Sequence, residues 1–481
     1  MPSDGPGLRR ELNIWETVGI SVALMAPSMA ANINPQGTAV SVGRAVPLAF
    51  ALATIGVLLI SWTFVRLCQR FNHSGSVYGF VGATLGPRTG VVAGWGLLGT
   101  YTFYGVGTAM ASGIFGTSFL DSLGIWNDPP SWAPFLLAAI VLVGVLLLTI
   151  SPIRQGTRTL LAVEAVTVVL ILITCVIIVV QLATGDAPGD RGLTLQPFSV
   201  PPGTQTSAIF LGVVFGFLSF AGFEAAATLG EEAREPRRNI PRAILGTAIF
   251  GGIYFVFVTW VEVMGFGTDA AGMTAFGQSG SLLGDLGTIY VGAWVGDLIS
   301  FGAAVSAFGC SLACAVGASR LLFALSRDGV TPVALSRVSP TRRTPVAAAL
   351  AVVVAMYVII AIAGVALGAE PFEVFLYAGT IGTLILLVAY ALATIGAARL
   401  VFFSPDSGTS VPRWQLVIPI LALVVVGYTL YRNVIPYPTG TAGWMPVVCG
   451  GWLLAAIVLV LARPQLAERA GRRLTAEEGL A

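Results

Sequence analysis

An acid follows a glycine inside one of the apolar stretches of this chain. Glu224 stands two residues after Gly222 in the run 219–244, SFAGFEAAATLGEEAREPRRNIPRAI, which begins apolar and ends charged. A helix that is interrupted inside a bilayer exposes backbone N–H and C=O groups, and these are tolerated only where they are buried in protein or line a cavity. A carboxylate at that depth tends to pair or to carry a proton. The run therefore predicts a binding site whose acid gates it or couples it to protons.

The first apolar stretch has a similar interruption. Between residues 17 and 42, Pro27 and Pro35 bracket a run of small and polar side chains. Proline has no backbone donor and clashes with the preceding turn. We therefore expect this helix to unwind between the two prolines, with a simple proline kink as the alternative. Interruptions at matching positions of two inverted halves point to a binding site near the middle of the membrane.

These interruptions lie in a chain whose composition suits a lipid bilayer. Of its 481 residues, 56% are hydrophobic and 10% are charged, which leaves too little polar surface for a soluble protein of this size. Crossing a bilayer takes about 20 apolar residues, and the sequence contains twelve candidate stretches. We predict an all-α integral membrane protein with one transmembrane domain at 17–462. A cytoplasmic amino-terminal tail is expected at 1–16, and a short, disordered cytoplasmic tail at 463–481.

Arginine indicates the orientation, because all 25 basic residues of the chain are arginines. With an even number of spans both termini face one side, and all arginines except Arg44, Arg191 and Arg432 fall in segments on that side. Cytoplasmic loops carry the excess of basic residues, so both termini of this cell-membrane protein are expected in the cytoplasm. A cleaved signal peptide ending near Ala30 is the alternative for the amino terminus. Cleavage there would place the next helix in the wrong orientation.

Other chemistries find little support in the sequence. The cysteines lie in or beside apolar stretches, which argues against a disulfide framework. Cys310 and Cys314 share a helix face without a neighbouring histidine or acid cluster, and His73 has no second ligand, so neither a metal nor a cofactor is predicted. The net charge of +2 gives no reason to invoke a nucleic acid. The sequence offers no Walker-type glycine loop, so ATP is not expected to drive the protein directly.

Three stretches carry a resemblance to a known family. They are the run 219–244, residues 70–101 (RFNHSGSVYGFVGATLGPRTGVVAGWGLLGTY) and residues 318–332 (ASRLLFALSRDGVTP). Together, in their order and spacing, they resemble the amino acid, polyamine and organocation (APC) permease superfamily. The resemblance implies a leucine-transporter-type fold and transport by alternating access. Two inverted halves of five helices, 17–182 and 207–399, would be followed by two extra helices at 413–462.

The resemblance also implies which residues meet the substrate. In such permeases the backbone N–H groups at the break of helix one hold the substrate's carboxylate, and carbonyls of helices one and six meet its ammonium group. Helix termini carry the partial charges that suit both tasks. Phe220 and Phe223 either close over the site as gates or pack in the core. The expected substrate-binding residues are Ser28, Met29, Ala30, Ala31, Asn32, Tyr104, Phe220, Ala221, Gly222 and Phe223.

Three residues are candidates for coupling or gating. Glu224 matches the acid that follows the helix-six break in many members of the superfamily. Glu164, in the fifth span, is expected to face helices one and eight. Several proton-coupled members have a lysine on helix five at the position where spacing puts Thr167, and this chain contains no lysine. Because the stretch 311–315 also lacks an adjacent pair of hydroxyl residues, the resemblance favours proton coupling or exchange over sodium.

The predicted function is a secondary active transporter, rather than an enzyme, that moves amino acids across the cell membrane. Its expected partners are an amino acid or organic amine, the lipid bilayer and protons. A transporter of polyamines or other organic amines is the main alternative, and a polyamine site needs several acids, whereas Glu262 and Asp297 are expected to reach water. A channel needs a repeated pore-lining ring, and a membrane-embedded enzyme needs a polar catalytic cluster. Neither pattern is found in the sequence.

Overall fold

The computed structural model describes residues 14–71, 77–151, 155–189, 191–229, 235–339, 344–403 and 411–477. Most of the amino-terminal tail and the last residues of the carboxyl-terminal tail lie outside these ranges. The loop histidine His73 and the centre of the charged loop after the helix-six break also lie outside the described residues.

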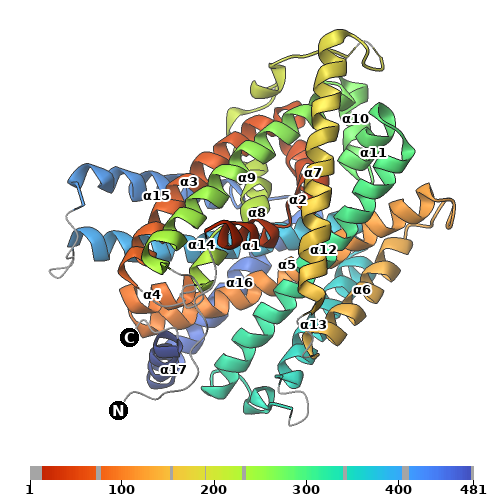
Figure 1. Cartoon of the computed structure of the whole chain (residues 1–481). Helices are drawn as coiled ribbons and strands as arrows, with labels where there is room; N and C mark the ends of the chain where they lie inside the picture. Colours follow the sequence, from red (N-terminus) through yellow and green to blue (C-terminus); the bar gives the residue numbers. More distant parts are fainter. Residues whose placement is uncertain are drawn as a thin grey trace.

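The described chain is helical, and Figure 1 shows helices of its first half lying among those of its second half. The helices of the first half are α1 (Ile14–Leu24), α2 (Pro27–Val42), α3 (Val46–Arg70), α4 (Val77–Leu85), α5 (Pro87–Ser122), α6 (Ala133–Thr149) and α7 (Gln155–Thr184). Those of the second half are α8 (Ile209–Phe220), α9 (Pro236–Phe266), α10 (Ala270–Gln278), α11 (Leu282–Tyr290), α12 (Ala293–Arg327), α13 (Val346–Ala361) and α14 (Pro371–Ala398). They are followed by α15 (Val417–Arg432), α16 (Trp444–Ala462) and α17 (Pro464–Glu477).

By length and composition, nine stretches of the described residues can cross a membrane. They are Pro27–Arg70, Thr159–Thr184, Thr206–Ala227, Pro236–Phe266, Ala293–Arg327, Val346–Ala366, Pro371–Phe403, Arg413–Arg432 and Gly440–Ala462. The first of them joins two helices, α2 and α3, through the short turn η1 (Gly43–Ala45). Within the described ranges no residue belongs to a β-strand. The prediction of an all-α protein with many membrane-spanning helices is confirmed.

Helices that are five spans apart in the predicted scheme contact one another. α2 packs against α8, α3 against α9, α5 against α12 and α6 against α13. α5 also contacts α14, α16 and α17, so it lies at the centre of the arrangement, as Figure 1 shows. The core between these helices combines small, aliphatic and aromatic side chains, of which Phe50, Phe64 and Phe255 are fully buried. Each half therefore completes the packing of the other half.

The carboxyl-terminal tail is structured, contrary to the sequence-based expectation of disorder. Residues Pro464–Glu477 form α17, which packs on α4, α5 and α16. Ala467 and Ala470 are completely buried, and a Cβ added at Gly471 would lie 2.0 Å from the carbonyl oxygen of Pro87. The many charges of this segment suggest disorder, but its small residues share one helix face and allow a close approach to α5. That face is what orders the tail.

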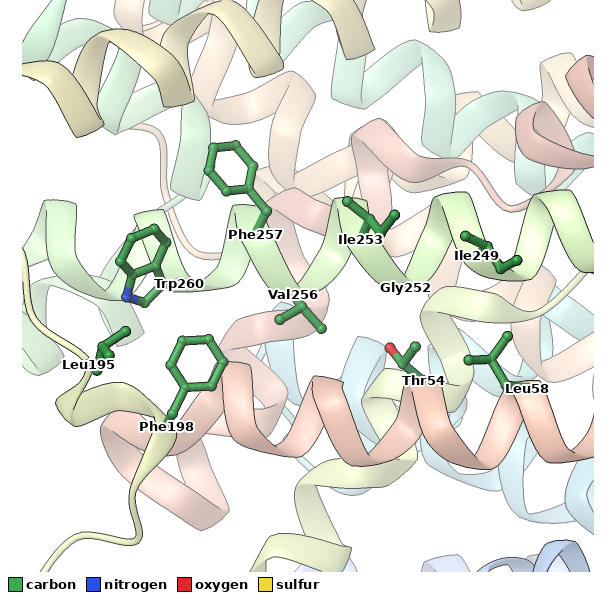
Figure 2. A pocket seen from close by; sticks show the side chains of 10 residues that line it. All are labelled: Thr54, Leu58, Leu195, Phe198, Ile249, Gly252, Ile253, Val256, Phe257 and Trp260. Atoms are coloured by element: carbon green, nitrogen blue, oxygen red, sulfur yellow. The ribbon is translucent and has the colours of Figure 1, made fainter.

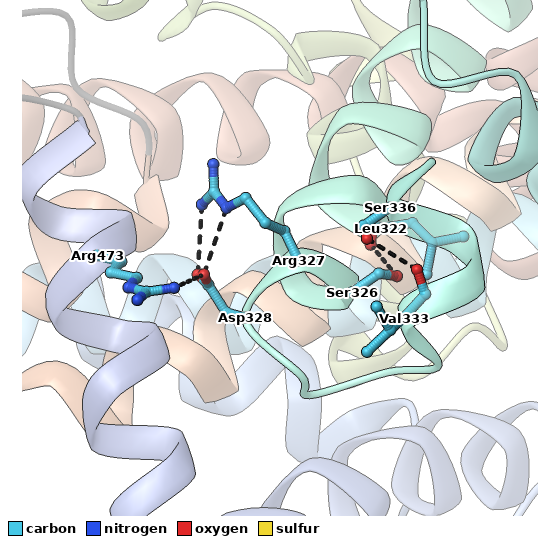
Figure 3. A network of polar contacts seen from close by, with 7 residues as sticks. All are labelled: Leu322, Ser326, Arg327, Asp328, Val333, Ser336 and Arg473. Atoms are coloured by element: carbon cyan, nitrogen blue, oxygen red, sulfur yellow. Dashed lines mark hydrogen bonds and ion pairs between the residues drawn. The ribbon is translucent and has the colours of Figure 1, made fainter. Parts of the chain in front are cut away.

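Ion pairs hold α17 to the ends of two other helices. Arg88 Nη2, at the start of α5, lies 3.1 Å from Glu468 Oε2, and Arg473 Nη1 lies 3.1 Å from Asp328 Oδ1, just after α12. Figure 3 shows Arg327 and Arg473 reaching the same carboxylate, and the Asp328 side chain is only 1% exposed. Hydrogen bonds from Arg472 and Arg88 hold the pKa of the Glu468 carboxyl below its ordinary value. This network of ion pairs connects α17 to the start of α5 and to the end of α12.

Candidate functional site

The break in the first span lies earlier than the sequence suggests. α1 ends at Leu24 and α2 starts at Pro27, with Ala26 between them in the left-handed conformation (φ 47°). The expectation of an unwound segment between Pro27 and Pro35 is therefore wrong. Pro27 is the first residue of α2, where its missing N–H is harmless, and α2 continues as a helix through Pro35. The interruption is a sharp break of about two residues.

The break in the sixth span lies where it was predicted. α8 ends at Phe220, Gly222 has a φ of 100°, and the chain continues in the short helix η4 (Ala225–Leu229). Only glycine adopts such a φ without strain. A Cβ added at Gly222 would lie 3.2 Å from the carbonyl oxygen of Leu24, at the end of α1. The two breaks are therefore in direct contact.

The N-terminus of α2 holds an acid from another helix. The backbone N–H of Ser28 donates a 2.8 Å hydrogen bond to Oε1 of Glu164, on α7, and the N–H of Met29 donates to Oγ of Ser306, on α12, at 3.3 Å. The Ser306 side chain also interacts with the Glu164 carboxylate, and Glu164 is 6% exposed. A helix N-terminus carries free donors and a partial positive charge. Glu164 thus lies between the first and eighth spans, as expected from the sequence.

The other residues expected at the first break face inward, but they form hydrogen bonds within the protein. Ala30 and Ala31 are fully buried, and the N–H of Ala30 donates to the carbonyl oxygen of Ala26 at 2.9 Å. The side-chain amide of Asn32 donates to the carbonyl of Ser28, and its Oδ1 accepts from Ser281 Oγ and from the backbone N–H of residue 283, each at 2.9 Å. Asn32 therefore fixes α2 to α11.

The acid that follows the sixth-span break interacts mainly with backbone N–H groups of its own segment, at Gly222 and Glu224. Glu224 is half-buried, and among the described residues its Oε2 has no hydrogen-bond partner. It lies in the electrostatic field of Tyr390 on α14 and of Tyr104 on α5, although the Tyr390 hydroxyl is outside ordinary hydrogen-bond geometry. Tyr104 is buried, and its hydroxyl is 3.0 Å from Thr383 Oγ1. Glu224 thus faces two phenol rings and keeps one oxygen available for a ligand.

The two phenylalanines of the sixth span lie in aromatic packing. Phe220 meets Phe255 edge-on at a centroid distance of 5.4 Å, and Phe223 meets Phe64 at 5.8 Å and Tyr390 at 6.0 Å. Both side chains are 1% exposed. Such contacts contribute about 0.5–1.5 kcal/mol each beyond burial. In this conformation Phe220 and Phe223 pack in the core, and a gating movement would have to break these ring contacts.

Two further residues differ from the picture expected from the sequence. The Thr167 hydroxyl donates to the carbonyl of Val163 on its own helix, and Thr167 packs against Gly302, where an added Cβ would lie 2.1 Å from Thr167 Oγ1. Glu262 was expected to reach water but is completely buried, and among the described residues neither of its carboxylate oxygens has a partner. It is buried because α7, α10 and α11 cover the C-terminal end of α9.

Two hollows open away from the helix breaks. The first, of about 570 Å³, lies between α3, α9 and the segment before α8. Figure 2 shows its lining of aliphatic and aromatic side chains, with Thr54 as the polar exception. Such a lining suits hydrocarbon rather than a charged substrate. The second, of about 610 Å³, is polar and is lined by Arg191, Asp269 and their neighbours at the C-terminal end of α9.

Sequence reasoning missed two residues of the site. Ser306 lies five residues before the stretch 311–315, which lacks an adjacent pair of hydroxyl residues, and no sequence pattern indicates Tyr390. The hydroxyl of Ser311 donates instead to the carbonyl of Gly105, on α5. The spacing of residues along one helix cannot show which turn faces the break of another helix. A hydroxyl on a small-residue helix was the only available signal.

A multi-spanning helical protein whose two interrupted helices meet in the interior has the architecture of a secondary transporter. The profile of the amino acid permease family matches residues 30–466, and the chain belongs to this family.

Three relatives illustrate the range of this family. The branched-chain amino acid permease BcaP of Bacillus subtilis is 25% identical over 352 residues, which cover 70% of this chain and 71% of the relative. The low-affinity putrescine importer PlaP of Escherichia coli is 27% identical over 346 residues, covering 70% and 72%. An uncharacterized transporter of Mycobacterium tuberculosis is 27% identical over 453 residues, covering 92% and 90%. Two of these three relatives are named as transporters of molecules that contain an amino group, and the third is uncharacterized.

Proposed function

We propose that the protein moves amino acids across the cell membrane by alternating access, as a secondary active transporter. The observation that carries the proposal is the contact between the two breaks, where Gly222 lies beside the carbonyl of Leu24. The carbonyls at the end of α1 and the backbone N–H groups at the start of α2 then border one small volume. A zwitterion needs both kinds of group.

The proposed topology has twelve spans and two inverted halves. The first span consists of α1 and α2 and the sixth of α8 and η4; the others are α3, α5, α6, α7, α9, α12, α13, α14, α15 and α16. The contacts of α2 with α8, α3 with α9, α5 with α12 and α6 with α13 support a repeat of five helices within 17–182 and 207–399. The arginine distribution supports cytoplasmic termini. The helices at 413–462 are the two extra spans.

The substrate is proposed to lie between the two breaks. Its ammonium group meets the carbonyls at the end of α1 and the carboxylate of Glu224, whose Oε2 lacks a partner among the described residues. Its carboxylate meets the N-terminal turn of α2, at Ser28 and Met29. Tyr104 and the chain at Ala221 and Gly222 line the remaining sides. Ala30, Ala31, Asn32, Phe220 and Phe223 stay in the proposed site as its supporting wall.

Transport is proposed to be coupled to protons or to proceed by exchange. Glu164 and Glu224 are the proposed coupling acids, because each is a carboxylate in the membrane interior without an ion pair among the described residues. Intramembrane acids of this kind commonly mark proton relays. Thr167, which packs on Gly302, is proposed to keep α7 close to α12.

A polyamine substrate is the second candidate. The first donors of α2 are already occupied by Glu164 and Ser306, which leaves two acids and few free donors around the breaks. That arrangement suits an amine without a carboxylate, as in the relative named as a putrescine importer. A polyamine would need both acids ionised at once.

A ligand screen by thermal shift tests the proposed function. The purified, detergent-solubilised chain is heated with each of the twenty amino acids and with putrescine, since a ligand that binds only the folded state raises its apparent stability. Stabilisation by one chemical group of amino acids is expected. Stabilisation by putrescine alone would select the second candidate, and stabilisation by neither would overturn the assignment to amino-group substrates.

A further inference from the structure

The two hollows described above have opposite polarity and adjoin near the C-terminal end of α9. The apolar hollow runs along α9 from Ile249 to Trp260, as Figure 2 shows. The polar hollow follows it along the same helix, from Met264 onward. One segment borders both hollows, because Leu195 lines the apolar one and Thr194 lines the polar one. A ligand that fills both hollows therefore has an apolar part and a polar part.

The apolar hollow has the depth of one leaflet of a bilayer. Between Ile249 and Trp260 an α-helix rises about 17 Å, and one half of a bilayer's hydrocarbon core is about 15 Å thick. The floor of the hollow is formed where α9 touches α3, since a Cβ added at Gly252 would lie 2.4 Å from Thr54 Cγ2. Ile253 is 69% exposed, so the hollow is open to the surface of a helix that can cross the membrane. Its length and lining suit an acyl chain.

Trp260 lies at the border between the two hollows. Its ring lines the apolar hollow beside Phe198, and its indole N–H donates to the carbonyl of Thr194 at 2.9 Å. Tryptophan is enriched at the level of the lipid headgroups, because one end of its side chain is apolar and the other is polar. The apolar hollow therefore lies at the depth of the acyl chains, and the polar hollow lies at the depth of the headgroups.

The polar hollow contains a cation and an acid that do not pair with each other. A Cβ added at Gly267 would lie 2.9 Å from Asp269 Oδ1 and 3.7 Å from Arg191 Nε, so the two charged side chains flank this glycine. Among the described residues neither of them forms an ion pair. Arg191 Nη1 donates to the carbonyl of Gly265 at 2.6 Å, and Asp269 Oδ1 accepts from the N–H of Gly272 at 3.1 Å. The other N–H groups of the guanidinium and the second carboxylate oxygen are left for a ligand.

We propose that the two hollows form one binding site for a phospholipid whose headgroup has a phosphate and a primary ammonium group, as in phosphatidylethanolamine. The acyl chain lies in the apolar hollow, the phosphate accepts hydrogen bonds from Arg191, and the ammonium group donates to Asp269. The planar guanidinium of arginine matches the oxygens of a phosphate. A purely anionic headgroup would leave Asp269 without a counter-charge, and a choline headgroup has no N–H to donate. The site lies away from the helix breaks, so the inference goes beyond the proposed transport and does not depend on its substrate.

Lipid binding to the purified and delipidated full chain tests the proposal. Native mass spectrometry gives the Kd of phosphatidylethanolamine, phosphatidylcholine and phosphatidylglycerol with the same acyl chains. Phosphatidylethanolamine should bind about tenfold or more tightly than the other two, because it alone forms both charged hydrogen bonds. Equal Kd values for the three lipids would overturn the proposal. Glycerophosphoethanolamine, which has the headgroup without the chains, should bind far more weakly, and binding as tight as that of the whole lipid would overturn a site that extends over both hollows.

Two charge variants locate the headgroup. Arg191→Gln should raise the Kd of phosphatidylethanolamine about tenfold or more. Asp269→Asn should remove the preference over phosphatidylglycerol, and it should fold normally because asparagine caps a helix as well as aspartate does. Arg432→Gln is the matched control, since this arginine donates to the carbonyls of Ser207 and Ile435 at the end of α15, and it should keep the wild-type values. A wild-type preference in both Arg191→Gln and Asp269→Asn would overturn the site.

A third variant locates the acyl chain. Ile253→Trp puts a larger side chain into the apolar hollow and should raise the Kd of phosphatidylethanolamine about tenfold or more. Ile420→Trp makes the same change at an exposed position of α15 and should leave the Kd unchanged. A wild-type Kd in Ile253→Trp would overturn the placement of the acyl chain between α3 and α9.

Discussion

The two helix breaks of this protein meet at one point, yet their acids are held in different ways. At the first break, Glu164 accepts a backbone hydrogen bond of 2.8 Å from Ser28 and interacts with Ser306. At the second, Glu224 faces two phenol rings, and its Oε2 has no hydrogen-bond partner among the described residues. A carboxylate whose donors are satisfied has to be displaced before a ligand uses its place, whereas an unsatisfied one is ready to bind. The two breaks therefore have different tasks in one site.

The largest effect is expected where the breaks touch. Gly222→Leu should lower transport by about a hundredfold or more, because misplacing a site by about 1 Å costs that much and the new side chain meets the carbonyl of Leu24 at a φ that only glycine favours. Uptake of radiolabelled substrate into proteoliposomes measures the loss. Gly427→Leu is the matched control, since nothing lies within 4 Å of an added Cβ there, and it should transport normally. Wild-type flux in Gly222→Leu would remove this contact from the site.

The second prediction concerns the unsatisfied acid. Glu224→Gln should raise the KM for the substrate by about tenfold or more at every pH, because a hydrogen bond to a charged group contributes about 1.5–3 kcal/mol. Initial uptake rates over a range of substrate concentrations at two pH values measure it. Asp297→Asn should leave the KM unchanged. An unaltered KM in Glu224→Gln would mean that the two acids do not differ in the way proposed.

A smaller effect is expected from the phenol beside this acid. Tyr390→Phe keeps the ring that packs on Phe64 and Phe223 and removes the hydroxyl near Glu224. The KM should rise about threefold, the value of one neutral hydrogen bond. The same uptake measurement applies, and Tyr428→Phe, on α15, serves as the control. A loss as large as that of Glu224→Gln would make Tyr390 a binding group in its own right.

The smallest effect on transport is expected at Ser306, the second residue that interacts with Glu164. Ser306→Ala leaves the N–H of Met29 without its acceptor and should lower the free energy of unfolding by about 1 kcal/mol. Transport should change by about twofold or less, because Ser28 still holds Glu164. Thermal unfolding and uptake are measured together. Ser319→Ala, which removes a bond within one helix, is the control, and a larger loss of transport in Ser306→Ala would assign Ser306 to the substrate.

Much of this arrangement can be predicted from the sequence, and the rest fails for physical reasons. Long apolar runs predict the spanning helices, and Gly222 predicts the second break, because glycine there permits a φ of 100° that other residues avoid. The first break differs from the prediction because Pro27 suggests a helix breaker, whereas at the first position of a helix proline is tolerated. The sequence predicts that Glu164 faces the first span, but not that its partner there is Ser28.

Contacts between helices account for the other errors. Glu262 is near the end of its span, which suggests contact with water, but α10 and α11 cover it. The sequence around Glu262 contains no pattern that predicts this cover. Ser306 gained its importance from a neighbour more than 270 positions away in the sequence, at Met29. The buried residues of the apolar face of α17 are alanines and a glycine, which a hydropathy scan does not detect. These features depend on the partner surface and not on the segment itself.

The docked helix α17 also sets an order for assembly. The ribosome produces α5 and α12 before α17, so Asp328 waits without Arg473, and Pro87 without its neighbour Gly471, until the preceding spans have been inserted. Docking of α17 then requires that α5 and α12 have reached their final places relative to each other, because α17 binds both. The ion pairs of this helix form completely only on a correctly assembled bundle. A chain that has inserted one span wrongly offers α17 no complete surface.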